Sequence, residues 1–138
     1  MGAIRERAEL FFKACDEGKG WDVCQEFCHP DATFSVQADA LAEVKTIQAY
    51  ADWLKGLYTF VTDERYDLKC FAVDEERNTA IWFAVFYGTH TGEGGPMPPT
   101  GKTAETDYVY SVQFDGDRIR HMTKIWNDAV CLQQLGWA

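Results

Sequence analysis

The stretch "TAIWFAVFYGTH", residues 79–90, decides the fold, because it contains a wholly apolar run from Ala80 to Phe86. A long, mostly apolar run of this kind is typical of a strand that is covered on both faces of a sheet. The run is far too short to span a bilayer, which needs about 20 apolar residues in a helix. We therefore place this stretch at the centre of a β-sheet.

The segments on either side of this stretch alternate between polar and apolar residues, which is the period of a strand. Three such segments are present: "ERYDLKCFAV" (64–73), "KTAETDYVYSVQF" (102–114) and "RIRHMTKIWN" (118–127). The connections are polar or rich in glycine: "DEERN" (74–78), "TGEGGPMPPTG" (91–101) and "DGD" (115–117). The second half of the chain therefore predicts a meander of about four antiparallel strands.

The first third of the chain has helical periodicity instead. Apolar residues recur at helical spacing from Ile4 to Cys15, and Gly18 and Gly20 then end the pattern. A second, shorter helix ends before Pro30, and "DATFSV" (31–36) follows as a short extended piece.

A third helix is expected after Thr46, which is a plausible N-cap. Its buried face would include Tyr50, Leu54 and Tyr58, with Trp53 beside it. The segment "AVCLQQLG" (129–136) predicts one or two closing helical turns. Helices segregated from an antiparallel sheet give an α+β domain, and a long twisted sheet curls so that helices can close its open side. The whole chain, residues 1–138, is expected to form a single domain.

Composition and charge exclude several classes of partner. The formal net charge of −9 repels nucleic acids and anionic membrane surfaces, so neither is expected as a partner. The opening "MGAIRERAELFF" (1–12) carries charges within an amphipathic pattern and has no signal-peptide core, so we expect a cytoplasmic location. The aromatic share of 14% would suit a wide apolar pocket, although plain packing would use it too.

The five cysteines have no paired spacing. Without a secretory signal, reduced and buried thiols are expected. Cys24, Cys28 and His29 form a C-x3-C-H pattern, but no second pair of ligands accompanies it. We therefore expect no metal site.

Four short motifs occur in one order along the chain: "GTHTG" (88–92), "PPTGK" (98–102), "DGDRI" (115–119) and "LQQLG" (132–136). Together with "HPDATF" (29–34), they resemble the SnoaL-like polyketide cyclases of the nuclear-transport-factor-two-like superfamily. The likeness runs from the first predicted helix to Gly136. It indicates the fold more strongly than the activity, because this fold carries many functions.

The resemblance implies a cone-shaped domain, in which three N-terminal helices close a curled antiparallel sheet around a deep apolar cavity. It also implies a homodimer, a hydrophobic small-molecule ligand and no cofactor. Cyclases of this family close a ring of a polyketide ester by intramolecular aldol condensation, with an Asp near the end of the last strand as acid and base. One carboxyl group with a raised pKa in a dry pocket can do both jobs.

Two neighbouring residues, Asn127 and Asp128, compete for the acid's position. Counting without gaps from "LQQLG" or from "DGDRI" places Asn127 there. A single β-bulge in the last strand would turn Asp128 and Trp126 inward, with Asp128 as the acid–base group. Without a bulge, Asn127 and His121 share the inner face, and His121 becomes its only titratable group. Alternatively, Asp128 is simply the N-cap of the closing helix.

Other residues are candidates for substrate binding. His90 ends the central strand on the same face as Trp82, and would either orient a substrate oxygen or anchor the glycine-rich loop behind it. Asp107 would line the cavity floor, or face water or a dimer partner. Four aromatic residues occupy positions that wall the cavity in this superfamily, or belong to the ordinary core: Phe12, Phe34, Tyr50 and Trp53. The loop 91–101 would be a lid or a dimer contact.

The expected function is a cyclase that acts by acid–base, aldol-type chemistry on a hydrophobic carbonyl substrate, with Asp128 as acid–base and with His121, His90 and Asn127 as polar helpers. A second hypothesis is a small-molecule binding protein without chemistry. A third keeps an enzyme on the same fold but changes the reaction to that of an isomerase, dehydratase or hydrolase.

Overall fold

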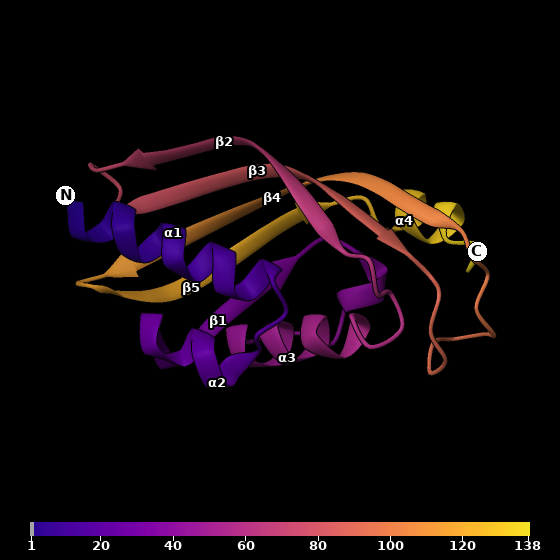
Figure 1. Ribbon diagram of the computed structural model, residues 1–138. Helices are drawn as coiled ribbons and strands as arrows, with labels where there is room; N and C mark the ends of the chain where they lie inside the picture. The colour runs from indigo at the N-terminus through magenta and orange to yellow at the C-terminus, as the bar shows by residue number, and fades with distance from the viewer. Residues whose placement is uncertain (1) are drawn as a thin grey trace.

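The computed structural model describes residues 2–138. The first elements of the chain are three helices with one strand between the second and the third; four consecutive strands and a final helix follow (Figure 1). The helices are α1 (Gly2–Asp16), α2 (Trp21–Cys24), α3 (Ile47–Leu57) and α4 (Asp128–Gln134), with single 3₁₀ turns at Gln25–Phe27 and Asp39–Leu41. The strands are β1 (Cys28–Val36), β2 (Arg65–Asp74), β3 (Thr79–Thr89), β4 (Thr103–Asp115) and β5 (Arg118–Trp126).

The five strands form one sheet in the order β1-β5-β4-β3-β2. The meander from β2 to β5 is antiparallel, as the sequence predicted. The sheet as a whole is mixed, because β1 pairs parallel with β5. The extended piece expected at 31–36 is thus an edge strand that begins at Cys28, and its partner is a segment far away in the sequence.

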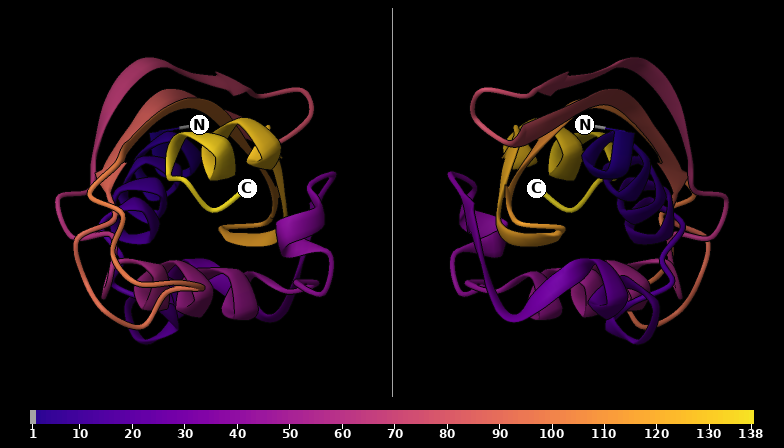
Figure 2. Two further views of the ribbon diagram at one scale, coloured as in Figure 1. Left: turned by 90° about the vertical axis from the view of Figure 1, so that its right-hand side faces the viewer. Right: turned by 90° about the vertical axis from the view of Figure 1, so that its left-hand side faces the viewer.

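The sheet is strongly curled and the helices lie against its concave side. In the end-on views of Figure 2 the strands arch over α1 and α4, and α3 lies across the open side. This arrangement confirms the expected α+β fold, a curled sheet closed by N-terminal helices. No helix in residues 2–138 has the length and apolarity that a membrane span requires.

The core forms between α1 and the inner face of the sheet. The apolar stripe of α1 places Phe11 and Phe12 inward with no exposed surface. The ring of Phe12 lies 5.3 Å from that of Trp82 and stacks at 5.9 Å on Tyr110. Burying each such ring contributes about 1.5–3 kcal/mol, so this contact between α1 and the sheet fixes the position of the last residue of α1, Asp16.

Helix α3 begins as the sequence predicted. The side chain of Thr46 accepts a hydrogen bond of 3.1 Å from the backbone N–H of Ala49, which is an N-cap. The buried face of α3 includes Tyr50 and Leu54. Because that face looks toward the sheet, Tyr50 meets side chains from β1, β4 and β5.

Candidate functional site

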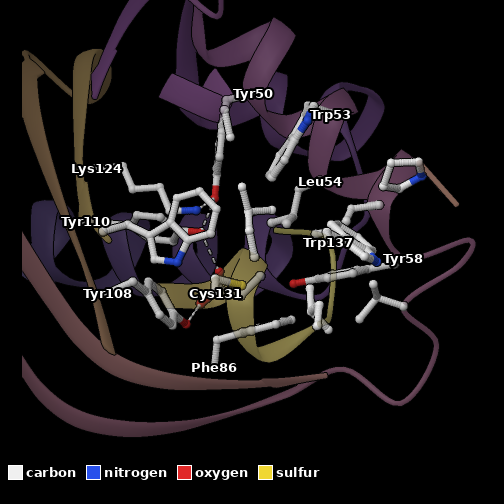
Figure 3. Close-up of a pocket in the computed structure, with 18 residues that line it drawn as sticks. Tyr50, Trp53, Leu54, Tyr58, Phe86, Tyr108, Tyr110, Lys124, Cys131 and Trp137 are labelled. Atoms are coloured by element: carbon white, nitrogen blue, oxygen red, sulfur yellow. Dashed lines mark hydrogen bonds between the residues drawn. The ribbon is translucent and has the colours of Figure 1, made fainter. Parts of the chain in front are cut away.

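A cavity of about 360 Å³ lies between α3, α4 and the inner face of the sheet. Its walls are mainly apolar, with lining residues that include Leu54, Leu57, Val61, Phe86, Leu132 and Leu135. Figure 3 shows Lys124, Tyr110 and Tyr108 at one end, and Tyr58 and Trp137 at the other. An apolar hollow of this size with a few converging polar groups is typical of a small-molecule site.

Asp16 is the acid at the polar end of this cavity. It is the last residue of α1 and only 5% exposed. The phenol of Tyr110 donates a hydrogen bond of 2.8 Å to Asp16 Oδ1, and the phenol of Tyr108 donates one to Oδ2. Both carboxylate oxygens therefore have a donor, and each keeps a further lone pair.

The hydrogen bonds continue from Tyr110 to Tyr50 and then to Lys124. The two phenol oxygens are 2.6 Å apart, and Lys124 Nζ lies 3.0 Å from the Tyr50 oxygen. A phenol has one proton to donate, and Tyr110 gives its proton to Asp16, so Tyr50 must donate to Tyr110. Every donor thus points from Lys124 toward Asp16. We call these four residues, Lys124, Tyr50, Tyr110 and Asp16, the relay.

Aromatic rings surround the amino group of Lys124, which is 6% exposed as a residue. Nζ lies 4.1 Å from the ring centre of Trp126, 5.0 Å from that of Tyr50 and 5.7 Å from that of Trp53. The negative faces of these rings stabilise a cation where water is absent. A charged lysine can therefore be held in an apolar cavity.

Burial shifts the pKa values at both ends of the relay. It raises the pKa of Asp16 from 3.8 to about 6, although the Tyr108 and Tyr110 phenols and Lys124 oppose the rise. It lowers the pKa of Lys124 from 10.5 to about 8, against the attraction of Asp16. Burial raises the pKa values of Tyr50 and Tyr110 well above their usual range, so the phenols stay protonated. Near neutral pH the cavity holds a carboxylate and an ammonium group that both titrate close to that pH.

The turn after α1 leaves room for one wall of the cavity. Gly18 has a φ of 73°, which glycine adopts without strain. A Cβ at this position would collide with the ring of Tyr58, which lines the cavity. The glycine that ends α1 therefore also allows Tyr58 to pack beside the site.

A sequence model of the SnoaL-like polyketide cyclases matches residues 6–135. The chain belongs to this family. None of the curated proteins matches the sequence.

The solved structures that resemble this family member show the same fold. A protein from Acidithiobacillus ferrooxidans, proposed to be a polyketide cyclase, matches with a TM-score of 0.76 and 19% identity, over 99% of this chain and 96% of that one. IdmH from Streptomyces antibioticus, also proposed to be a polyketide cyclase, matches with a TM-score of 0.73 and 21% identity, over 96% and 98%. A protein from Bacillus subtilis, proposed to be an isomerase, matches with a TM-score of 0.74 and 17% identity, over 99% of this chain and 95% of that one. At these identities the likeness shows the fold alone.

The last strand in this family member contains the β-bulge considered from sequence, but of the two residues expected to turn inward only Trp126 does so. The register of β5 against β4 shifts by one residue at Arg120, and Lys124 and Trp126 then line the cavity. The strand ends at Trp126, however, and Asp128 is the first residue of α4. Its carboxylate accepts a hydrogen bond of 2.8 Å from the backbone N–H of Ala40, so the carboxylate is not among the groups that line the cavity.

Asn127 and His121 also lie away from this cavity. Asn127, rather than Asp128, is the N-cap of α4, and its side chain accepts a 3.2 Å hydrogen bond from Val130 N–H. His121 lies on the outer face of β5, where its ring contacts the hydroxyl groups of Thr33 at 2.7 Å and Ser35 at 3.0 Å. Burial and Arg120 lower its pKa. The structure thus places the three expected catalytic residues outside the cavity.

His90 is fully buried beneath the glycine-rich loop. Its Nδ1 accepts hydrogen bonds from Trp137 Nε1 at 2.9 Å and from the backbone N–H of Thr100 at 3.3 Å. This is the position of a loop anchor, one of the two roles considered from sequence. Trp137 and Pro96 line the cavity, so His90 fixes the segments that cover one end of it.

The expected wall residues fall into two groups. Tyr50, Trp53 and Trp126 line the cavity. Two others support the relay from behind: Phe34 stacks on Tyr50 at 4.6 Å, and Phe12 stacks on Tyr110 at 5.9 Å. Trp82 supports Tyr108, because its Nε1 donates to the Tyr108 oxygen at 3.3 Å. Asp107 is exposed and shares an open outer hollow with Asn127 and Asp128.

Four residues of the polar end were not singled out from sequence: Asp16, Tyr108, Tyr110 and Lys124. A signal was present for each. Asp16 is four residues after Phe12 and so lies on the apolar stripe of α1, and Lys124 alternates with Met122 and Trp126 on the inner face of β5. Among residues 2–138 no three His, Cys, Asp or Glu side chains are grouped as a metal site would require.

Proposed function

We propose that this protein closes a ring in an apolar carbonyl compound by intramolecular aldol condensation, with Asp16 as the acid–base group. The observation that supports this proposal most strongly is the position of Asp16, a buried carboxyl with a pKa raised to about 6 at the polar end of an apolar cavity. A general base is most effective when its pKa lies near the working pH. We assign the role to Asp16 and not to Asp128, whose carboxylate is bonded to the backbone of Ala40.

In the proposed reaction the Asp16 carboxylate removes a proton from the carbon next to a substrate carbonyl. Negative charge moves to the carbonyl oxygen, where the Lys124 ammonium and the Tyr50 phenol can stabilise it. The enolate carbon then attacks a second carbonyl of the same molecule, and a C–C bond forms. The new alkoxide takes a proton from Asp16, so the carboxylate is regenerated.

The apolar walls supply the positioning. A flexible chain with two carbonyl groups must fold so that the two carbons meet, and a rigid cavity removes much of that entropic barrier. A volume of about 360 Å³ limits the substrate to a small, largely apolar molecule. The same first proton transfer, followed by return of the proton to another carbon, would give an isomerase.

The variant Asp16→Asn tests this proposal, because the amide is close in size but cannot exchange a proton. With a panel of linear aryl 1,5-diketones as probes, which can close a six-membered ring, we expect ring closure to fall by about 10²–10⁴-fold, while binding of the same probes is retained. Asp117→Asn, in the exposed β4–β5 turn, is the matched control. Unchanged turnover in the Asp16 variant would end the assignment.

A binding protein without chemistry is the second candidate, and one observation favours it. Both oxygens of Asp16 already accept phenol hydrogen bonds, which stabilise the carboxylate and weaken it as a base. If every probe that binds is recovered unchanged from both the original protein and the Asp16 variant, binding is the function.

The homodimer and the cytoplasmic location that the sequence suggested are also proposals. Light scattering after size-exclusion chromatography would give the mass directly, and a mass near 15.7 kDa would show a monomer. Microscopy of the tagged protein in its cell of origin would test the location.

A further inference from the structure

The amino group of Lys124 is a nucleophile in an apolar cavity. It lines the cavity, yet among the described residues the Tyr50 phenol is its one hydrogen-bond partner. An ammonium group has three protons to donate, so two of them meet aromatic rings and not acceptors. A neutral amine would lose few hydrogen bonds on moving from water into this cavity. A charged ammonium group lacks most of the hydrogen bonds that water would provide.

The relay offers a route by which Lys124 can become neutral. The groups that face its amino group are Asp16 and Cys15 from α1, Tyr50 from α3, Tyr110 from β4 and Cys131 from α4. Because every donor in the relay points toward Asp16, one concerted shift moves a proton from Lys124 through both phenols to the carboxylate. The charged pair becomes an amine and a carboxylic acid, and no charge has to leave the cavity.

The pKa values make that neutral pair accessible. The values of about 6 for Asp16 and about 8 for Lys124 differ by about two pH units. At pH 7 the fraction of neutral amine is then on the order of a hundredfold larger than for an exposed lysine. A desolvated lysine of this kind is the usual nucleophile for carbonyl carbons.

We propose that Lys124 forms an imine with a ketone or aldehyde carbon of the substrate, so that the cyclisation passes through a covalent enamine. This inference rests on the proposed function: it keeps Asp16 as the acid–base group and replaces the enolate, and the charge-stabilising role of Lys124, by an enamine on Lys124. It names the substrate class, because a ketone or aldehyde condenses with an amine under these conditions and an ester or acid does not. The aromatic rings that now surround the ammonium group would surround the positive iminium group in its place.

The step balances without any added reactant. The Nζ lone pair attacks the carbonyl carbon, a C–N bond forms and the C=O π bond opens. The nitrogen's extra proton passes to the former carbonyl oxygen, which gives a neutral carbinolamine and leaves Asp16 protonated. The protonated Asp16 then gives its proton to the hydroxyl group of the carbinolamine, which leaves as water. Overall, one ammonium group and one ketone give one iminium ion and one water, and Asp16 is again a carboxylate.

The later steps use the same residues. Asp16 removes the proton from the carbon next to the iminium group, which gives a neutral enamine. The enamine carbon attacks the second carbonyl of the substrate, a new C–C bond forms, and the oxygen of that carbonyl takes the proton from Asp16, which is again a carboxylate. Addition of water to the resulting iminium group releases the product and restores the amine of Lys124.

A β-diketone tests the inference without knowledge of the substrate. The probe is 1-phenylbutane-1,3-dione, whose imine rearranges to a stable vinylogous amide that absorbs in the near ultraviolet. We expect one adduct per chain, lighter by one water than the sum of the two masses, and peptide mapping should place it on Lys124. Lys124→Arg keeps a positive charge opposite Asp16 but cannot form an imine, so the adduct should be lost. Lys45→Met, at an exposed position, should label like the original protein.

The outcomes separate the two proposals. An adduct on Lys124 that Lys124→Arg abolishes supports the covalent route. No adduct, or equal labelling of many surface lysines, overturns it. Loss of turnover in Asp16→Asn together with no adduct would leave Asp16 as a base in a non-covalent cyclase. Lys124→Met provides a second removal of the amine should Arg not fit, and it is scored by the same mass measurement.

Discussion

Asp16 and Lys124 are buried at the two ends of one continuous chain of hydrogen bonds, although 108 positions of the sequence, counted as 124 − 16, separate them. The chain places a weak acid and a weak base in the same apolar cavity. Each stabilises the charged form of the other, while burial disfavours both charges.

The stability of the fold should depend on the titration of Asp16. Its pKa is higher in the folded protein, about 6, than its ordinary value of 3.8. The folded state therefore binds this proton more tightly, and the resulting stability is complete below pH ~4 and is lost as the pH rises through about 6. We expect the free energy of unfolding, relative to Asp16→Asn, to fall by about 3 kcal/mol between those limits. Urea denaturation of both proteins across pH 3.5–7 measures it, and a flat difference would contradict the buried position of Asp16.

Removing one phenol should change the pKa of Asp16 in a known direction. In Tyr110→Phe the carboxylate loses a 2.8 Å hydrogen bond, and this bond lowers its pKa at present. The pKa of Asp16 should rise further above 6, so the acidic limb of the pH–rate profile should move to higher pH. The maximal rate should also fall, because the relay to Lys124 is broken. Tyr87→Phe, on the outer face of β3, is the control, and a profile that matches this control would exclude a role for the relay.

The anchor beneath the glycine-rich loop should control access to the cavity. His90→Leu removes the acceptor of Trp137 Nε1 and Thr100 N–H. A buried donor left without a partner costs about 1–3 kcal/mol, so we expect the C-terminal segment with Trp137 to detach. Hydrogen exchange of residues 91–101 and 135–138 should become faster, and probe binding should weaken. Exchange rates equal to those of the original protein would show that packing alone holds these segments.

Local sequence patterns predicted the helices and strands well where interactions between residues close in the sequence determine them. The cap at Thr46, the helical stripe up to Cys15 and the alternation in residues 102–114 each depend on neighbours within a few positions. The alternation of the strand also placed Asp107 on the outer face, between inward-facing neighbours, which is one of the two alternatives considered from sequence. The fold followed from these signals together with the four ordered motifs.

The site was harder to predict because it depends on contacts between distant segments. No local pattern shows that β1 pairs parallel with β5, or that β5 shifts its register at Arg120. That one-residue shift decides which side chains of the last strand face inward. The motif count directed attention to residues 127 and 128, whereas the inward charge is Lys124 and its acid is Asp16, at the end of the first helix.

The titration of Asp16 itself tests the account most directly. Carbon-detected NMR of the Asp16 carboxyl group, assigned by its disappearance in Asp16→Asn, should give a midpoint near 6. In Lys124→Met the midpoint should move higher still, because the neighbouring positive charge is gone. A midpoint near the ordinary value of 3.8, or one that ignores the loss of Lys124, would show that the two residues do not share a proton-exchanging site.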